Sequence, residues 1–322
     1  PSRPAQTPAL GLRIDAAGAG LAAALLLVAI FFTQSRGPWL GLFAGLFVFV
    51  SLLLWQGLRL ARARDQLPRV RLLRGLLIGW VALSAAGGAF LVAFNLSRAP
   101  VFEQLREIPY IGRMGRLLEV NEGTGLVRRL IWAGDEHAGG AIGLITSDPL
   151  RALIGWGPES MFVAFNPFYP PSLANIEARG ASPDRSHQAL LDELVTKGAL
   201  GLASYLFVLA SFGVLSWRLM RRSESWAWQV FFIACLSAVV CHVVEGLTGI
   251  PIVSTLMMFW VLMAMSVTGG AVAGHYGLSL APAPAEATGS EAPAAGAQPA
   301  AQPAGARQGQ AASGKRRQQA QR

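Results

Sequence analysis

Six long apolar segments constrain the fold of this chain more than any other feature. They occupy residues 16–33, 39–58, 75–96, 199–217, 227–244 and 252–272. A helix needs roughly 20 mostly apolar residues to cross a bilayer, and each segment meets or approaches that length. Buried helices of a soluble bundle are a weaker explanation, because such helices normally keep a polar face. The sequence therefore predicts an all-α polytopic membrane protein with about six transmembrane helices.

Composition supports this interpretation and divides the chain into three parts. Only 14% of the 322 residues are charged, whereas about a quarter are charged in soluble domains. Residues 1–15 are expected to be a cytoplasmic lead-in, and residues 16–279 to form the membrane domain. Residues 280–322 are rich in Ala, Pro and Gln, and they predict a disordered cytoplasmic tail because they cannot bury enough apolar surface to fold.

Basic clusters set the expected orientation. They lie at 59–74, 218–222 and 315–322, and an even number of crossings separates them. The positive-inside rule therefore places all three in the cytoplasm. The long loop 97–198 then lies on the outer side, together with two short connections. The formal net charge of +9 reflects this orientation, so nucleic acid is not expected as a partner.

Small residues recur within two of the apolar segments, at 17–20 and at 85–88. Glycine and alanine let membrane helices approach closely. We expect helix contacts at these positions.

The outer loop 97–198 is close to neutral and carries helix signals. Residues 124–145 have the pattern of an amphipathic helix interrupted near Gly139 and Gly140. Residues 182–198 predict a helix that starts at Ser182 or Asp184 and stops at Gly198. The segment between them is rich in Gly, Pro and aromatic residues, which indicates a folded re-entrant or surface segment. Loops of this length are usually functional.

Three cationic positions are the main candidates for chemistry. Arg36 follows the first apolar segment in a short turn, where an arginine either extends to lipid headgroups or binds an anion. Arg128 and Arg129 diverge by roughly 100° on a helix, so only one of them faces a given ligand. His187 is either a packing residue or a group that takes a proton from a hydroxyl near neutral pH.

Weaker candidates lie nearby. Asp184 and Arg185 either orient His187 or cap its helix, and capping is the preferred interpretation for Asp184. His242 and Glu245 are three residues apart on one helix and are expected to lie close enough to pair. Five aromatic residues of the loop form either a sugar or lipid platform or an interfacial anchor; these are Trp156, Phe162, Phe165, Phe168 and Tyr169.

Motifs for cofactors and metals are absent from the sequence. It contains no Walker loop, no Rossmann fingerprint and no nucleophile elbow. Its four histidines are scattered along the chain. No cofactor and no metal site is therefore expected.

Three sequence blocks together resemble a known family. They are TQSRGPWLGLFAGL, RRLIWAGDEHAGGAIGLITSDPLRALIGWGPESM and DRSHQALLDELVTKGALGLASYL. In this order, with a long outer loop between the first and the last, they resemble the O-antigen ligase and polymerase superfamily of bacterial membrane glycosyltransferases. The resemblance covers residues 31–272. It implies that the chain is the C-terminal half of a longer protein, because family members usually have further spans before this region.

The resemblance also implies an activity. A glycan would move, without a metal ion, from a polyprenyl diphosphate carrier to a glycan, lipid or protein hydroxyl at the outer face of the bacterial cytoplasmic membrane. Arg36 and Arg129 would bind the diphosphate, and His187 would act on the acceptor or the diphosphate. Arg129 is preferred to Arg128 because it directly precedes Leu-x-Trp. The family's usual His-Asn is His187-Gln188 here, which leaves the role of that amide open.

Two other function classes stay open on the sequence alone. Half of a membrane transporter would use Arg36 and Arg129 to line an anion path, although its spans should then carry more charge near the midplane. A non-catalytic membrane scaffold would use the outer loop only to bind a partner. Membrane lipid is an expected partner in every case.

Overall fold

The computed structural model describes residues 16–33, 35–178 and 180–277, and these contain helices and loops but no strand. The chain is an all-α polytopic membrane protein, as the apolar segments predict. The expected lead-in 1–15 and tail 280–322 lie outside the described residues.

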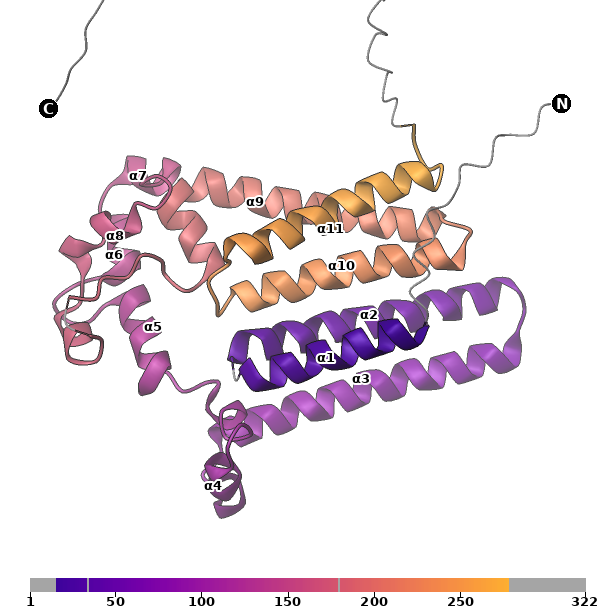
Figure 1. Cartoon of the computed structure of the whole chain (residues 1–322), viewed down its shortest axis with the longest axis horizontal. Helices are drawn as coiled ribbons and strands as arrows, with labels where there is room; N and C mark the ends of the chain where they lie inside the picture. The colour runs from indigo at the N-terminus through magenta and orange to yellow at the C-terminus, as the bar shows by residue number, and fades with distance from the viewer. Residues whose placement is uncertain (1–15, 34, 179, 278–322) are drawn as a thin grey trace, which may run out of the picture. The chain divides into compact units, whose positions relative to one another are not determined.

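Six long helices correspond to the six apolar segments (Figure 1). They are α1 (Ala16–Thr33), α2 (Arg36–Ala63), α3 (Leu67–Leu96), α9 (Ala189–Arg222), α10 (Trp226–Gly246) and α11 (Val253–Val272). Five of them are long and apolar enough to cross a membrane, and α1 is shorter. The helices α2, α3 and α9 extend well beyond the apolar segments, through basic residues at the end of α2 and the start of α3 and through both ends of α9.

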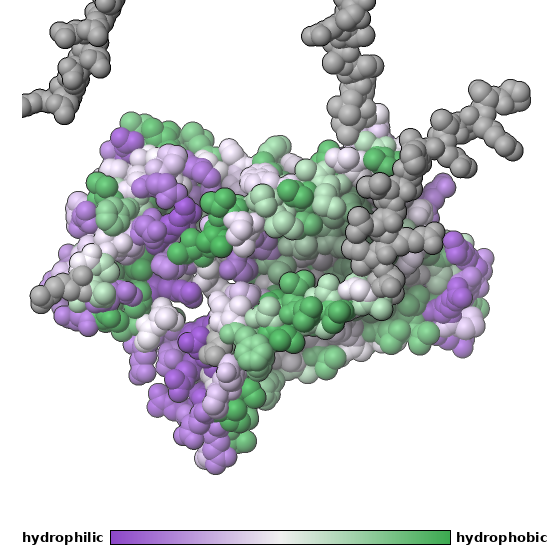
Figure 2. All heavy atoms as spheres, viewed as in Figure 1, coloured by the Kyte–Doolittle hydropathy of each residue, from purple (hydrophilic) through white to green (hydrophobic). Residues whose placement is uncertain are grey.

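Helices α2 and α10 form the centre of the packing. Helix α2 contacts α10 and α3, while α10 also contacts α9 and α11. Buried Phe212, Val239 and Phe259 join α9, α10 and α11, and buried Leu219 and Phe232 pack against side chains of α2. Figure 2 shows hydrophobic surface along the helices and hydrophilic residues gathered toward their two ends. This distribution suits helices surrounded by lipid.

Two glycines of α2 set the close approach to α10. A Cβ atom at Gly41 would lie 2.6 Å from the carbonyl oxygen of Cys241, and one at Gly45 would lie 2.9 Å from that of Ser237. The expected contacts at 17–20 and 85–88 are not found where the structure tests them, because Cβ atoms at Gly20, Gly87 and Gly88 would meet nothing within 4 Å. Glycine frequency alone does not distinguish a helix contact from a lipid-facing surface.

Because of this difference, one valine substitution should lower the stability of the protein and another should leave it unchanged. Gly41→Val forces α2 and α10 apart, since overpacking of this kind costs roughly 1–3 kcal/mol. Gly88→Val, which introduces the same residue into open space, should leave the stability within about 0.5 kcal/mol. Unfolding of the two variants in detergent micelles measures the contrast, and equal stability of both would contradict the α2–α10 contact.

Residues 97–188 fold at one end of the long helices, which we call the loop end. This segment contains five α-helices, α4 (Pro100–Glu107), α5 (Gly123–Ala133), α6 (Gly140–Thr146), α7 (Pro149–Ile154) and α8 (Met161–Ala164), and the 3-10 helices η1 (Met114–Arg116), η2 (Asn166–Phe168) and η3 (Pro171–Asn175). Fully buried Leu144, Phe165 and Leu173 form its core, together with Val195 of α9. The loop end is therefore a folded unit anchored on the first turns of α9.

Gly198 interrupts α9 and fixes this anchor. Its backbone has φ +66° and ψ −170°, a combination that only glycine adopts readily. The break leaves the carbonyls of Val195 and Thr196 free, and they accept hydrogen bonds from the backbone N–H groups of Trp156 and Gly157, both at 2.9 Å. The expected stop at Gly198 is thus a kink, after which the helix continues into the membrane span.

Candidate functional site

Arg36 begins α2, where the sequence predicted a turn of about four residues. It is half-buried and lines a pocket of about 220 Å³ at the loop end. Arg113 also lines this pocket, whose other walls include Phe31, Trp39 and Tyr110. The pocket therefore combines two guanidinium groups with an aromatic wall, an arrangement that suits an amphiphile with an anionic head.

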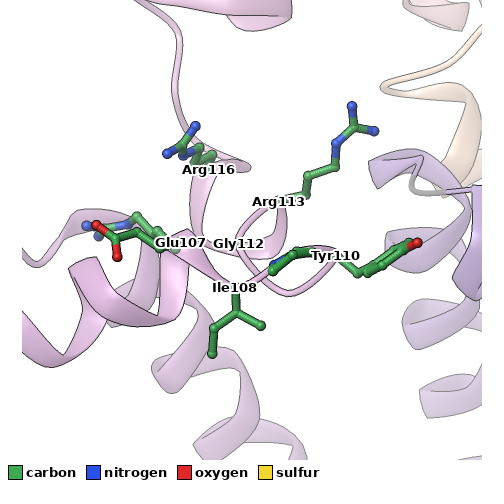
Figure 3. A pocket seen from close by; sticks show the side chains of 8 residues that line it. Glu107, Ile108, Tyr110, Gly112, Arg113 and Arg116 are labelled. Carbon is green, nitrogen blue, oxygen red and sulfur yellow. The ribbon is translucent and has the colours of Figure 1, made fainter.

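The segment 108–116 brings further positive charge to Arg36. Tyr110 stacks on Phe31 with the ring centroids 5.3 Å apart, which holds the segment against α1. Arg113 and Arg116 both interact electrostatically with Arg36. They line a second pocket, of about 350 Å³, with Tyr110 and Glu107. Figure 3 shows both arginines projecting to the same side of the segment, while Tyr110 extends away from Glu107.

Arg106 lies beside these arginines but has a structural role. Its guanidinium donates to the carbonyl oxygens of Phe94 and Ser97, both at 2.6 Å, and forms an ion pair with Glu103 at 2.7 Å. These contacts hold α4 against the end of α3. They occupy the side chain of Arg106, whereas Arg113 and Arg116 interact electrostatically with Arg36.

Arg128 is close enough to Arg36 and to His187 to act electrostatically on each of them. It is half-buried on α5. Burial lowers the pKa of Arg128, but a guanidinium stays charged at neutral pH. Arg129 is exposed on the other side of the same helix. Of the two adjacent arginines, the structure brings Arg128 toward Arg36 and His187.

His187 lies in a loop before α9. The predicted helix start at Ser182 or Asp184 is wrong, because α9 begins at Ala189. The expectation that Asp184 caps this helix is wrong as well. The side-chain oxygen of Gln188 accepts a hydrogen bond from the backbone N–H of Leu191 and provides the cap. Gln188 thus has a clear local role at the position where the family usually has Asn.

Three hydrogen bonds hold the residue before His187. The backbone N–H and the hydroxyl of Ser186 donate to Oδ1 of Asp192 at 2.6 and 2.7 Å. The indole Nε1–H of Trp132 donates to the Ser186 carbonyl oxygen at 2.6 Å. Trp132 lies on α5, within one turn of Arg128 and Arg129. This bond therefore ties the arginine helix to the histidine loop.

The backbone and surroundings of His187 are unusual. Its φ of +60° is in the left-handed region, which costs a non-glycine residue roughly 1–2 kcal/mol. Burial lowers the pKa of His187, and repulsion by Arg128 lowers it further, while Asp192 and Asp184 act in the opposite direction. The net effect favours the neutral imidazole, the form that is able to accept a proton.

The weaker candidates lie in a separate pocket of about 300 Å³ between the loop end and helices α9 to α11. Asp184, Arg185 and His242 all line it. Arg185 forms an ion pair with Glu159, and the ring of His242 lies 4.9 Å from that of Phe259. Arg185 and His242 thus each contact another residue that lines the same pocket.

The predicted pairing of His242 with Glu245 is not found among the described residues. Glu245 instead lies beside two glycines, Gly37 and Gly249. The two side chains, three residues apart on α10, are therefore directed to different neighbours. Four of the five loop aromatics, all except the exposed Phe162, belong to the apolar core or pack against it. They support the loop end from within.

Asp135 is a further acid that sequence reasoning did not single out. Its carboxylate accepts hydrogen bonds from the hydroxyl and the backbone N–H of Ser172 and from two backbone N–H groups of the next turn. These bonds hold the pKa of Asp135 well below its usual range. The carboxylate therefore fastens the α5–α6 connection to η3.

No group of three His, Cys, Asp or Glu side chains in residues 16–33, 35–178 and 180–277 is arranged to hold a metal ion. No family model, no curated protein and no solved structure matches this chain.

Proposed function

We propose that this protein is an O-antigen ligase-like glycosyltransferase that moves a glycan from a polyprenyl diphosphate carrier to an acceptor hydroxyl. The observation that carries the proposal is the series Arg36, Arg128 and His187. These residues come from three separated segments, yet electrostatic interactions link them at the loop end. They belong to the three sequence blocks that resemble the family.

The pocket beside Arg36 supports a lipid-linked donor. A polyprenyl diphosphate has an apolar chain and a head with several negative charges. Arg36 and Arg113 offer guanidinium groups for bidentate contacts with phosphate oxygens, and Trp39 and Phe43 on the same pocket wall offer apolar surface. The pocket therefore provides a contact for each part of the donor where the carrier leaves the bilayer.

The chemistry divides between the cations and the histidine. The acceptor hydroxyl oxygen attacks the anomeric carbon while the bond from that carbon to the diphosphate breaks. The hydroxyl proton passes to the neutral imidazole of His187. The departing diphosphate carries the bonding electron pair, and Arg36 and Arg128 stabilise its charge. Positioned guanidinium groups thus do the work that a divalent ion does in other diphosphate-dependent enzymes.

In this proposal the loop end faces the outer side of a bacterial cytoplasmic membrane, as the basic clusters indicate. The acceptor is a hydroxyl of a glycan, a lipid or a protein. Asp184, Arg185 and His242 line the pocket between the loop end and helices α9 to α11. Their carboxylate, guanidinium and imidazole groups offer hydrogen-bond partners to the hydroxyls of an acceptor.

A transfer assay in the presence of a chelator tests the proposal. The full chain, reconstituted in liposomes with a polyprenyl diphosphate-linked glycan and candidate acceptors, should yield the glycosylated acceptor and the free carrier diphosphate. Excess EDTA should leave the rate unchanged. Failure to consume the donor would contradict the proposed function, and activity that needs a divalent ion would contradict the role of the arginines.

A further inference from the structure

A second arginine cluster lies at the end of the long helices away from the loop end, where α2 and α9 both terminate (Figure 1). Four arginines line a hollow of about 650 Å³ there, together with Trp217. They are Arg59 of α2 and Arg218, Arg221 and Arg222 of α9. No acidic side chain is among the described residues that line the hollow. Its positive charge is therefore not balanced from within.

The arrangement of these arginines is held by the fold. Residues 221 and 222 lie three and four positions after 218, so both are neighbours of Arg218 on α9, and all three line the hollow. The guanidinium of Arg59 donates to the backbone carbonyl oxygen of Arg221 at 3.0 Å, so it is fixed across the hollow. Arg59 and Arg221 repel each other. A bound anion would relieve this repulsion.

Aromatic surface adjoins the cluster on the membrane side. The rings of Trp55 and Trp217 stack with centroids 4.8 Å apart, and the guanidinium of Arg59 lies 5.9 Å from the centre of the Trp55 ring. Trp217 is partly exposed, and the exposed Val214 lies one turn before it on α9. Tryptophan is enriched at the membrane–water interface, where one side of the ring is apolar and the other is wet.

We infer that this hollow is a binding site for an anionic phospholipid whose headgroup carries two phosphates. Four guanidinium groups suffice for two bidentate phosphate contacts. The acyl chains lie along Trp217 and Val214. Free phosphate offers only the head and leaves this apolar surface uncovered, whereas a phospholipid covers both. The site is separate from the proposed transfer site and does not depend on it.

Lipid retention measured by native mass spectrometry tests the inference. The full chain is taken from nanodiscs of phosphatidylcholine that contain equal charge equivalents of cardiolipin or phosphatidylglycerol. We expect one cardiolipin retained per chain, and phosphatidylglycerol retained more weakly. The double variant R221Q/R222Q should lower cardiolipin retention at least tenfold. The matched control R71Q/R74Q removes the same charge from exposed positions on the first turns of α3, outside the hollow, and should retain cardiolipin as the unmodified chain does.

Three results would overturn the inference. Equal loss in both double variants would indicate general attraction to the membrane surface. Displacement of cardiolipin by millimolar inorganic phosphate would indicate a free-phosphate site. Unchanged retention in R221Q/R222Q would show that the cluster does not bind the lipid. If the double variant does not fold, the single variant R222Q provides the comparison.

Fluorescence quenching reports the position of the acyl chains. Quenching by cardiolipin with brominated chains is measured for the unmodified chain and for Trp217→Phe, and the difference between the two gives the contribution of Trp217.

Discussion

Arg128→Gln lowers the transfer rate about 10²–10³-fold, whereas Arg129→Gln retains most of the activity. The two substitutions remove the same charge from adjacent positions on α5. They differ in surroundings, because Arg128 is half-buried and interacts electrostatically with Arg36 and His187, while Arg129 is exposed. Glutamine keeps the length and polarity of the side chain but cannot neutralise a departing diphosphate.

Initial rates at saturating acceptor, with the donor varied, measure this contrast. Loss of a charge contact made mainly with the departing diphosphate lowers kcat, and loss of a contact made equally with the bound donor raises KM. The reverse order, with Arg129→Gln the slower variant, would support the choice that the Leu-x-Trp spacing favours and would contradict the role of Arg128. If both substitutions change the rate only slightly and to the same extent, neither arginine of α5 belongs to the site.

Much of the fold could be predicted from the sequence because apolar length alone specifies a transmembrane helix. All six segments are helices, and the basic clusters at 59–74 and 218–222 lie at helix ends, whereas the cluster at 315–322 is outside the described residues. Helix contacts were not predictable in the same way. Glycines at 17–20 and 85–88 differ from Gly41 and Gly45 only in what lies opposite them, and a single sequence does not contain that information.

The start of α9 was predicted too early for a different reason. Ser182 and Asp184 are good capping residues, so the sequence favoured them. The helix begins later because Ser186 forms hydrogen bonds with Asp192 and thereby holds residues before Ala189 out of the helix. Both residues lie close in sequence, and their pairing was missed because serine and aspartate six residues apart do not form a standard capping pattern.

The choice between Arg128 and Arg129 depends on the rotation of α5. Burial of Leu130 and Ile131 fixes that rotation. Trp132, which donates to the loop before His187, is four residues from Arg128 and three from Arg129. Trp132 is therefore a helix neighbour of both arginines, and its spacing alone could not decide between them. Arg113 and Arg116 were harder to recognise as residues of the candidate site, because basic residues in a glycine-containing turn are common.

His187→Asn removes the proposed base and lowers the rate about 10²–10⁴-fold. Asparagine is the suitable replacement because it tolerates the left-handed backbone that His187 adopts with φ +60°, so the loop should keep its path. As a control, the His187→Asn variant should keep the helical content and the unfolding midpoint of the unmodified chain. Activity near the original level in a folded His187→Asn protein would exclude the imidazole as the base.

The pH dependence of kcat/KM provides a second test of His187 as the base, because the direction of each shift can be predicted. His187 must be neutral to accept a proton, so activity falls as the pH drops through its pKa. Burial and Arg128 lower that pKa below the usual value, so the acid limb of the profile lies at a lower pH than an unperturbed histidine would give. Arg128→Gln removes a repulsion, raises the pKa of His187 and moves the limb to higher pH. Asp184→Asn removes an attraction and moves it to lower pH. Shifts of the same sign in both variants would contradict the assignment, because a positive and a negative charge near one titrating group displace its pKa in opposite directions.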